Sequence, residues 1–118
     1  MKNLRIVFVL LLWATLSALH VHGQAAPKLV KSVVIHTSAT CDECKVIIES
    51  ALKKVKGVKK SNLDLVTKDV TVSYADWKTN PETLRKAISM AGYDADDVKA
   101  DQEAHDNLPK CCKSGMEE

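Results

Sequence analysis

The chain has 118 residues, which is room for one domain of ordinary size. It carries 17 basic and 15 acidic residues. Residues 1–23, which read as a removable leader, hold two of the basic residues and no acidic ones, so the rest is formally neutral. A neutral domain gives no electrostatic basis for nucleic-acid binding, and we exclude that class of function.

The first segment is typical of a secretory signal peptide. Lys2 and Arg5 form a positive start, and an apolar run extends from Ile6 to about Leu16. That run is shorter than the roughly 20 residues that a membrane-spanning helix needs. The residues ending at Gly23 fit a cleavage signal, so we expect a periplasmic or secreted protein; an uncleaved anchor is the alternative.

The sequence therefore divides into four parts: a signal peptide (1–23), a short linker (24–28), a folded domain (29–101) and a polar, cysteine-containing tail (102–118). Residues 29–36 are rich in β-branched side chains and predict the first strand of the domain.

A helix should follow this strand. Thr40 and Glu43 match the capping box S/T-x-x-E, in which each side chain satisfies a backbone donor near the other. Apolar residues then recur at helical spacing as far as Val55. Lys56-Gly57 is expected to end the helix, because glycine suits a left-handed cap.

Two segments with alternating apolar residues, 61–66 and 69–74, predict a β-hairpin closed by Thr67-Lys68. A second helix is predicted over residues 81–91, with Pro81 in its first turn.

Residues 94–101 predict a last short strand. The tail beyond it has no periodicity and is expected to be loosely ordered, apart from a turn near Leu108-Pro109. The order β-α-β-β-α-β predicts an α+β fold of the ferredoxin-like type, in which one antiparallel sheet carries two helices on one face.

Cys41 and Cys44 form a Cys-x-x-Cys motif at the predicted start of the first helix. Unpaired N–H groups there favour thiolates, whereas Asp42 and Glu43 add negative charge and would attract a cation. Cu(I) and Hg(II) accept two sulfurs, while Zn(II) normally takes four ligands. The same spacing also suits a redox dithiol or a structural disulfide, and export favours oxidised cysteines.

Two observations weaken the redox interpretation. A thioredoxin-like domain needs a different element order and a cis-proline before a strand, but Pro81 precedes a helical pattern. No tryptophan stands just before the motif.

The stretch TSATCDEC, placed between a strand and a helix, resembles the heavy-metal-associated domain. That family includes copper chaperones, the metal-binding modules of metal-pumping ATPases and the periplasmic mercury-binding protein. The resemblance covers about residues 29–100 and extends to LDLVTKDVTVSY (63–74) and AISMAGYDA (87–95). With AGYDADDVKAD and LPKCC, it is also similar to a subgroup of exported single-domain members from Bacteroidetes-type bacteria.

The resemblance implies that Cys41 and Cys44 bind a metal in an exposed loop and hand it to a partner by sharing ligands. It places Tyr93 beside the site, where it would tune access and charge together with Thr40, Asp42 and Glu43. The sequence departs from the family pattern at Ser38-Ala39, where a Gly-Met pair is usual.

The tail contains a second cysteine pair, Cys111-Cys112. Adjacent cysteines rarely bridge each other, because the ring is strained. They would supply extra thiolates to Cys41 and Cys44, or else they would oxidise to other chains or to the motif. His36 and His105 are weaker ligand candidates.

The sequence thus predicts an exported protein without enzymatic activity that captures a soft ion through Cys41 and Cys44. Cu(I) or Hg(II) is favoured over Zn(II), and the ion would be sequestered or passed to a metal-transporting membrane protein, by a monomer or a metal-bridged dimer. A thiol–disulfide oxidoreductase using the same pair is the alternative, and a small interaction domain stapled by disulfides is a third hypothesis.

Overall fold

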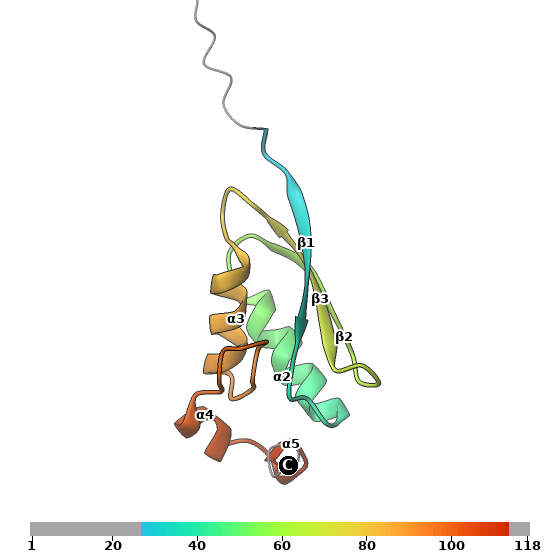
Figure 1. Cartoon of the computed structure of the whole chain (residues 1–118), viewed down its shortest axis with the longest axis vertical. Coiled ribbons are helices and arrows are strands. Elements are labelled where there is room, and N and C mark those ends of the chain that lie inside the picture. The colour runs from blue at the N-terminus through green and yellow to red at the C-terminus, as the bar shows by residue number, and fades with distance from the viewer. Residues whose placement is uncertain (1–26, 114–118) are drawn as a thin grey trace, which may run out of the picture.

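A sheet of three antiparallel strands forms one layer of the protein (Figure 1). The structure is a computed structural model that describes residues 27–113. The strands are β1 (Val30–His36), β2 (Val58–Asp64) and β3 (Asp69–Ala75), in the order β1-β3-β2. The predicted signal peptide and most of the linker lie outside the described residues. Within residues 27–113, no helix is long and apolar enough to cross a membrane.

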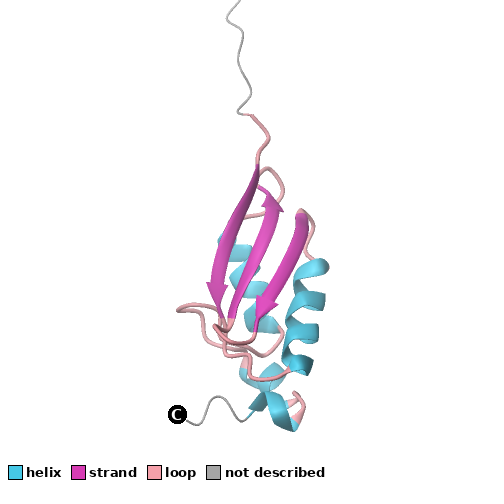
Figure 2. Cartoon of the chain, turned by 90° about the vertical axis from the view of Figure 1, so that its right-hand side faces the viewer, coloured by secondary structure: helices cyan, strands magenta, loops and turns pink. Residues whose placement is uncertain are grey.

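Two helices, α2 (Asp42–Lys53) and α3 (Pro81–Met90), cover one face of this sheet (Figure 2). The alternation of β3 turns its apolar side chains toward these helices, because successive residues of a strand point to opposite faces. The resulting core is made of buried residues from both layers, including Val70, Val72, Ile48, Leu52, Leu84 and Ile88. The predicted α+β class, an antiparallel sheet with its helices on one face, is confirmed.

The beginning and end of α2 differ from the prediction. The cap position is occupied by Cys41, whose side chain makes no capping hydrogen bond, so the predicted capping box is wrong. The Thr40 hydroxyl instead donates to the carbonyl of Cys111, at 2.6 Å. The helix stops at Lys53, and Gly57 adopts a left-handed φ of +99° where the chain turns into β2.

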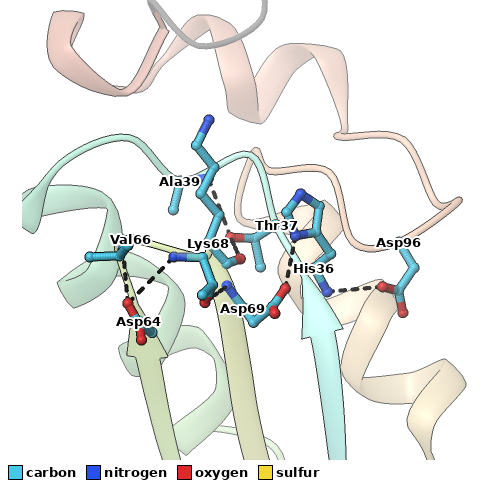
Figure 3. Close-up of polar contacts among 9 residues, drawn as sticks. His36, Thr37, Ala39, Asp64, Val66, Lys68, Asp69 and Asp96 are labelled. Carbon is cyan, nitrogen blue, oxygen red and sulfur yellow. Dashed lines mark hydrogen bonds and ion pairs between the residues drawn. The ribbon is translucent and has the colours of Figure 1, made fainter.

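The hairpin and the second helix form as predicted, except that β2 spans Val58–Asp64 and not 61–66. Residues 65–68 connect β2 to β3, and the carboxylate of Asp64 accepts a hydrogen bond from Val66 N at 2.8 Å within this turn (Figure 3). The α3 helix has Pro81 in its first turn, and the Asn80 side chain accepts a hydrogen bond from Thr83 N at 2.9 Å. Both elements are set by local turn and cap chemistry.

The predicted strand over 94–101 is wrong. Within that segment the structure has isolated bridges, which pair Ala95 with Thr37 and with Val98. Asp96 N donates to the carbonyl of His36 at 2.8 Å, so the segment lies beside the end of β1. Asp96 has a φ of +52°, which a β-strand cannot accommodate.

The expectation of a loosely ordered tail is also wrong for residues 102–113. Two short helices, α4 (Gln102–Asp106) and α5 (Lys110–Lys113), follow the domain and lie at the end of the sheet where β1 stops (Figure 1). The Asp101 side chain caps α4 by accepting from Ala104 N at 2.9 Å. Leu108 and Cys112 are buried in the core, which explains the order of a segment with no periodicity.

Candidate metal centre

The four cysteines meet at one end of the domain. Cys41 and Cys44 come from the start of α2, and Cys111 and Cys112 come from α5. The two motif sulfurs lie 3.2 Å apart. Cys44 Sγ is 2.6 Å from Cys112 Sγ, and Cys41 Sγ is 2.7 Å from Cys111 Sγ and 3.5 Å from Cys112 Sγ. All of these distances exceed the roughly 2.05 Å of a disulfide bond.

The loop before the motif is held by backbone and hydroxyl contacts. The Thr37 hydroxyl donates to the carbonyl of Lys68 at 2.9 Å and accepts from Ala39 N at 3.3 Å (Figure 3). Ser38 accepts a hydrogen bond from Asp94 N at 3.0 Å, and Ala39 is fully buried. Small side chains at 38 and 39 therefore let this loop pack closely against the segment after α3.

The four sulfurs differ sharply in exposure. Cys44 and Cys112 are buried at 0% and 1% exposure, Cys41 is partly buried, and Cys111 is exposed. The resemblance implied a pair of cysteines in an exposed loop. In the structure, α5 lies over this loop, and one sulfur of each cysteine pair faces the interior.

Burial and neighbouring thiols act in opposite directions on the acidity of these groups. Burial raises the pKa of Cys44, but hydrogen bonding with Cys112, Thr40 and Cys41 outweighs it, and the pKa falls to about 7. Hydrogen bonding with Cys41 and partial desolvation raise the pKa of Cys111 to about 11. Burial and the contact with Cys44 raise the pKa of Cys112 well above its usual range. Cys44 is thus the thiol most readily ionised among these three.

Tyr93 lies beside the thiols of Cys44 and Cys112 and has no solvent exposure. Its hydroxyl is buried and makes no hydrogen bond within the described residues. Burial, followed by the adjacent thiols of Cys112 and Cys44, raises the pKa of Tyr93 far above its usual value. The residue therefore lies beside the cluster as expected, but as a buried neutral hydroxyl.

The other predicted tuning residues lie at the rim. Glu43 Oε2 accepts from Cys111 Sγ at 3.5 Å, and Thr40 connects the loop to α5 through its bond to the Cys111 carbonyl. Asp42 is exposed in the first turn of α2, where its charge is favoured by the helix dipole. These contacts join the motif to the tail.

Neither His36 nor His105 is among the residues that contact the sulfurs. The His36 ring lies 2.8 Å from the carboxylate of Asp69, and its backbone N–H donates to Asp96 (Figure 3). His105 Nδ1 is 3.2 Å from the carbonyl of Gly92.

The arrangement can bind a thiophilic ion. The ligand atoms of Cys41, Cys111 and Cys112 all lie within 4.8 Å of one another, and Cys44 lies in contact with two of them. Thiolates in such a cluster select soft metals such as Cu(I), or Zn(II) when four are available. Sequence reasoning left open whether the tail reaches the motif. Leu108 and Cys112, which are both buried, hold the tail there, and no periodic pattern in the sequence indicates this contact.

Comparison with known proteins places this site in context. The heavy-metal-associated domain matches residues 33–94. The chain is similar to the periplasmic component of the mercuric transport protein of Serratia marcescens, with 39% identity over 54 residues. That alignment covers 46% of this chain and 59% of the relative, so the chain spans less than two thirds of that protein's length.

Two other relatives align over nearly their whole length. The copper chaperone CopZ of Staphylococcus haemolyticus is 33% identical over 66 residues, which is 56% of this chain and 97% of CopZ. The structure of oxidized MerP from Ralstonia metallidurans superposes with a TM-score of 0.55 and 31% identity, and it covers 57% of this chain and 94% of MerP.

Proposed function

The chain belongs to the heavy-metal-associated domain family, and on that basis we propose that it is an exported protein that captures a soft metal ion through Cys41 and Cys44. The observation that carries the proposal is the position of this pair at the start of α2, with its sulfurs 3.2 Å apart. Two thiolates at that separation can close on one ion with little side-chain movement.

The cargo we propose is Cu(I) or Hg(II), with Zn(II) less favoured. Soft ions match thiolate ligands, and the chain is similar to relatives named for copper and for mercury. Zn(II) prefers a closed set of four ligands. Asp42 and Glu43 bring negative charge to the rim of the site, which attracts a cation of any of these kinds.

The captured ion would be sequestered or passed to a metal-transporting membrane protein, without chemical conversion. The mercuric relative is named as a periplasmic transport component, which supports a role outside the cytoplasm. The oxidoreductase alternative is not favoured, because Pro81 lies in the first turn of α3.

A metal titration tests the proposal. The reduced chain without residues 1–23 should bind Cu(I) or Hg(II) tightly, and Cys41→Ser or Cys44→Ser should weaken binding by at least about a hundredfold, since one of the two capturing thiolates is lost. A matched control combines Cys44→Ser with Ser50→Cys, at an exposed position of the same helix. It keeps four thiols and should not restore binding. Full binding by this control would contradict the assignment.

A further inference from the structure

One of the tail sulfurs forms a triangle with the motif pair. Cys112 Sγ lies 2.6 Å from Cys44 Sγ and 3.5 Å from Cys41 Sγ, and the motif sulfurs themselves are 3.2 Å apart. An ion bound at about 2.3 Å from three sulfurs in one plane needs edges of about 4 Å. The three edges must therefore lengthen by about 0.5 to 1.4 Å to admit it, most of all the edge between Cys44 and Cys112.

The position of Cys112 is fixed by the fold. Its thiol is 1% exposed and belongs to the core, together with Leu108. Its backbone N–H donates to the carbonyl of Pro109 at 3.0 Å, and the Thr40 hydroxyl holds the carbonyl of Cys111 at 2.6 Å. A ligand supported in this way is already in place before an ion arrives.

A buried hydroxyl donor, that of Tyr93, lies next to two of these three sulfurs. The Tyr93 hydroxyl makes no hydrogen bond within residues 27–113, and the thiols of Cys112 and Cys44 act on it directly. A buried hydroxyl without a partner is costly to the fold, by about 1–3 kcal/mol. Thiolates on Cys44 and Cys112 would accept this O–H more strongly than the neutral thiols do, so an anionic, ion-loaded cluster stabilises the buried hydroxyl better than the empty cluster.

We propose that Cys112 is the third ligand of the metal site and that Cys111 is its exposed entry ligand. The proposal rests on the proposed function and deepens it, because it assigns three-thiolate rather than two-thiolate coordination to the same soft ion. Successive residues of a helix point about 100° apart, so one cysteine of α5 faces the core while its neighbour faces solvent.

Entry proceeds by ligand exchange. The ion first binds Cys41 and Cys111, whose sulfurs lie 2.7 Å apart at the exposed side. Bonds to Cys44 and Cys112 then form as the bond to Cys111 breaks. Each thiol that binds releases its proton to solvent, and the Cys111 thiolate takes one back, so no oxidant or reductant is needed. The third bond makes the protein retain its ion.

The test is X-ray absorption of the full mature chain loaded with one equivalent of Cu(I), with affinity measured by chelator competition. Wild type should show three sulfur ligands. Cys112→Ser should show two and lose at least about tenfold in affinity. Cys111→Ser should keep three sulfurs and an affinity within about threefold, while its rate of ion uptake falls by about tenfold.

The wild-type sulfur count needs no variant, so a folding defect in Cys112→Ser does not hide the answer. Leu108→Ala keeps all four thiols but loosens α5, and it should lower the sulfur count in the same direction. Two sulfurs in wild type with unchanged affinity in Cys112→Ser would overturn the third-ligand assignment and leave the proposed function intact. Four sulfurs in wild type would overturn the entry role of Cys111. Absence of any bound Cu(I) or Hg(II) would overturn the proposed function itself.

Discussion

In Tyr93 the ring and the hydroxyl have different roles, the ring in the core and the hydroxyl beside the cysteines. Its ring fills the core between the motif and the tail, while its hydroxyl lies beside Cys44 and Cys112 with no hydrogen bond within the described residues. A ring of this size contributes to packing whether or not an ion is present. The hydroxyl has a stronger acceptor when the neighbouring sulfurs are ionised than when they are neutral thiols.

Tyr93→Phe should therefore leave the unfolding free energy of the metal-free protein unchanged or raise it by about 1 kcal/mol, because it removes an unsatisfied buried group. It should weaken Cu(I) binding by about tenfold, because a hydrogen bond to a charged acceptor is lost. Urea unfolding and chelator competition measure the two effects. The control is Tyr74→Phe, a buried tyrosine of β3, which should leave affinity unchanged. Equal affinities in the two variants would contradict the role of the Tyr93 hydroxyl.

Asp96 is a second residue whose side chain connects distant parts of the fold. Its carboxylate accepts from His36 N at 2.9 Å and from Arg85 Nε at 2.8 Å. Partial burial alone would raise the pKa of Asp96, but the bonds with Arg85 and His36 prevail and hold that pKa below its usual value. A lowered pKa in the folded state stabilises the protein above the unfolded pKa of about 4, and that contribution is lost as the pH falls through the folded value.

Asp96→Asn should lower the free energy of unfolding by about 1 kcal/mol at pH 7, because the two hydrogen bonds lose their charged acceptor. The cost is small because the carboxylate is partly exposed to solvent. Asparagine tolerates the positive φ at this position, so backbone strain does not confuse the result. The difference from wild type should shrink as the pH falls below about 4. Asp97→Asn, at the next exposed carboxylate, should change stability by less than about 0.5 kcal/mol. A difference that stays constant with pH would refute the linkage.

At the scale of elements, the packing of α4 and α5 against the domain determines which cysteines lie at the metal site. Gly92, which ends α3 with a φ of +102°, lies against the backbone of α4: a Cβ added there would meet Ala104 C and His105 N at 3.0 Å. Gly57 has a similar φ of +99°, but its added Cβ would meet Lys78 and Thr79, away from the tail. The two glycines thus share a backbone requirement and differ in what they contact.

Gly92→Ala and Gly57→Ala should each destabilise the domain by about 1–3 kcal/mol, since alanine is strained at this φ. Only Gly92→Ala should also increase hydrogen exchange in residues 102–113 and lower the affinity for Cu(I), because it displaces α4 and with it Cys112. Urea unfolding, hydrogen exchange and chelator competition measure these effects. Equal loss of affinity in both variants would mean that the tail is not attached through this contact.

Elements set by local chemistry could be predicted from the sequence, and elements set by distant contacts could not. The alternation of Val70, Val72 and Tyr74 and the Asn80-Pro81 start of α3 determine their structures within a few residues. Thr40 fits a capping box locally, yet its hydroxyl bonds to a carbonyl 71 positions away.

The remaining differences have similar causes. Asp96 interrupts a predicted strand because its backbone is held in a left-handed turn, by contacts with β1 and α3. The Cys-x-x-Cys spacing identified Cys41 and Cys44 as a motif, but no periodic pattern in the tail predicted that α5 would lie over it. Two isolated apolar contacts, at Leu108 and Cys112, order the tail.

At the scale of the whole molecule, all four sulfurs belong to one chain and lie together. An ion surrounded by thiolates of a single chain has no need of a second chain to complete its coordination. A two-thiolate site, by contrast, leaves room for ligands from another molecule. The tail therefore bears on whether the loaded protein is a monomer or a metal-bridged dimer.

We expect the wild-type protein to remain a monomer after addition of one equivalent of Cu(I) or Hg(II). The double variant Cys111→Ser with Cys112→Ser should form dimers that hold one ion per two chains, since the two remaining thiolates leave the ion room for ligands from a second chain. Sedimentation velocity with and without metal measures this, and metal-free samples of both proteins serve as controls. Metal-dependent dimers of the wild type would contradict the enclosure of the ion by one chain.

The contact between Cys44 and Cys112 joins positions 68 residues apart, close to the two ends of the folded domain. An ion bonded to both sulfurs would therefore act as a cross-link that closes a long loop. A permanent link of that length lowers the conformational entropy of the unfolded chain by the equivalent of about 4 kcal/mol. While the ion is bound, the domain would be protected against unfolding and against proteolytic loss of its tail. Cargo release would restore both vulnerabilities, so that the lifetime of the protein would follow its metal content.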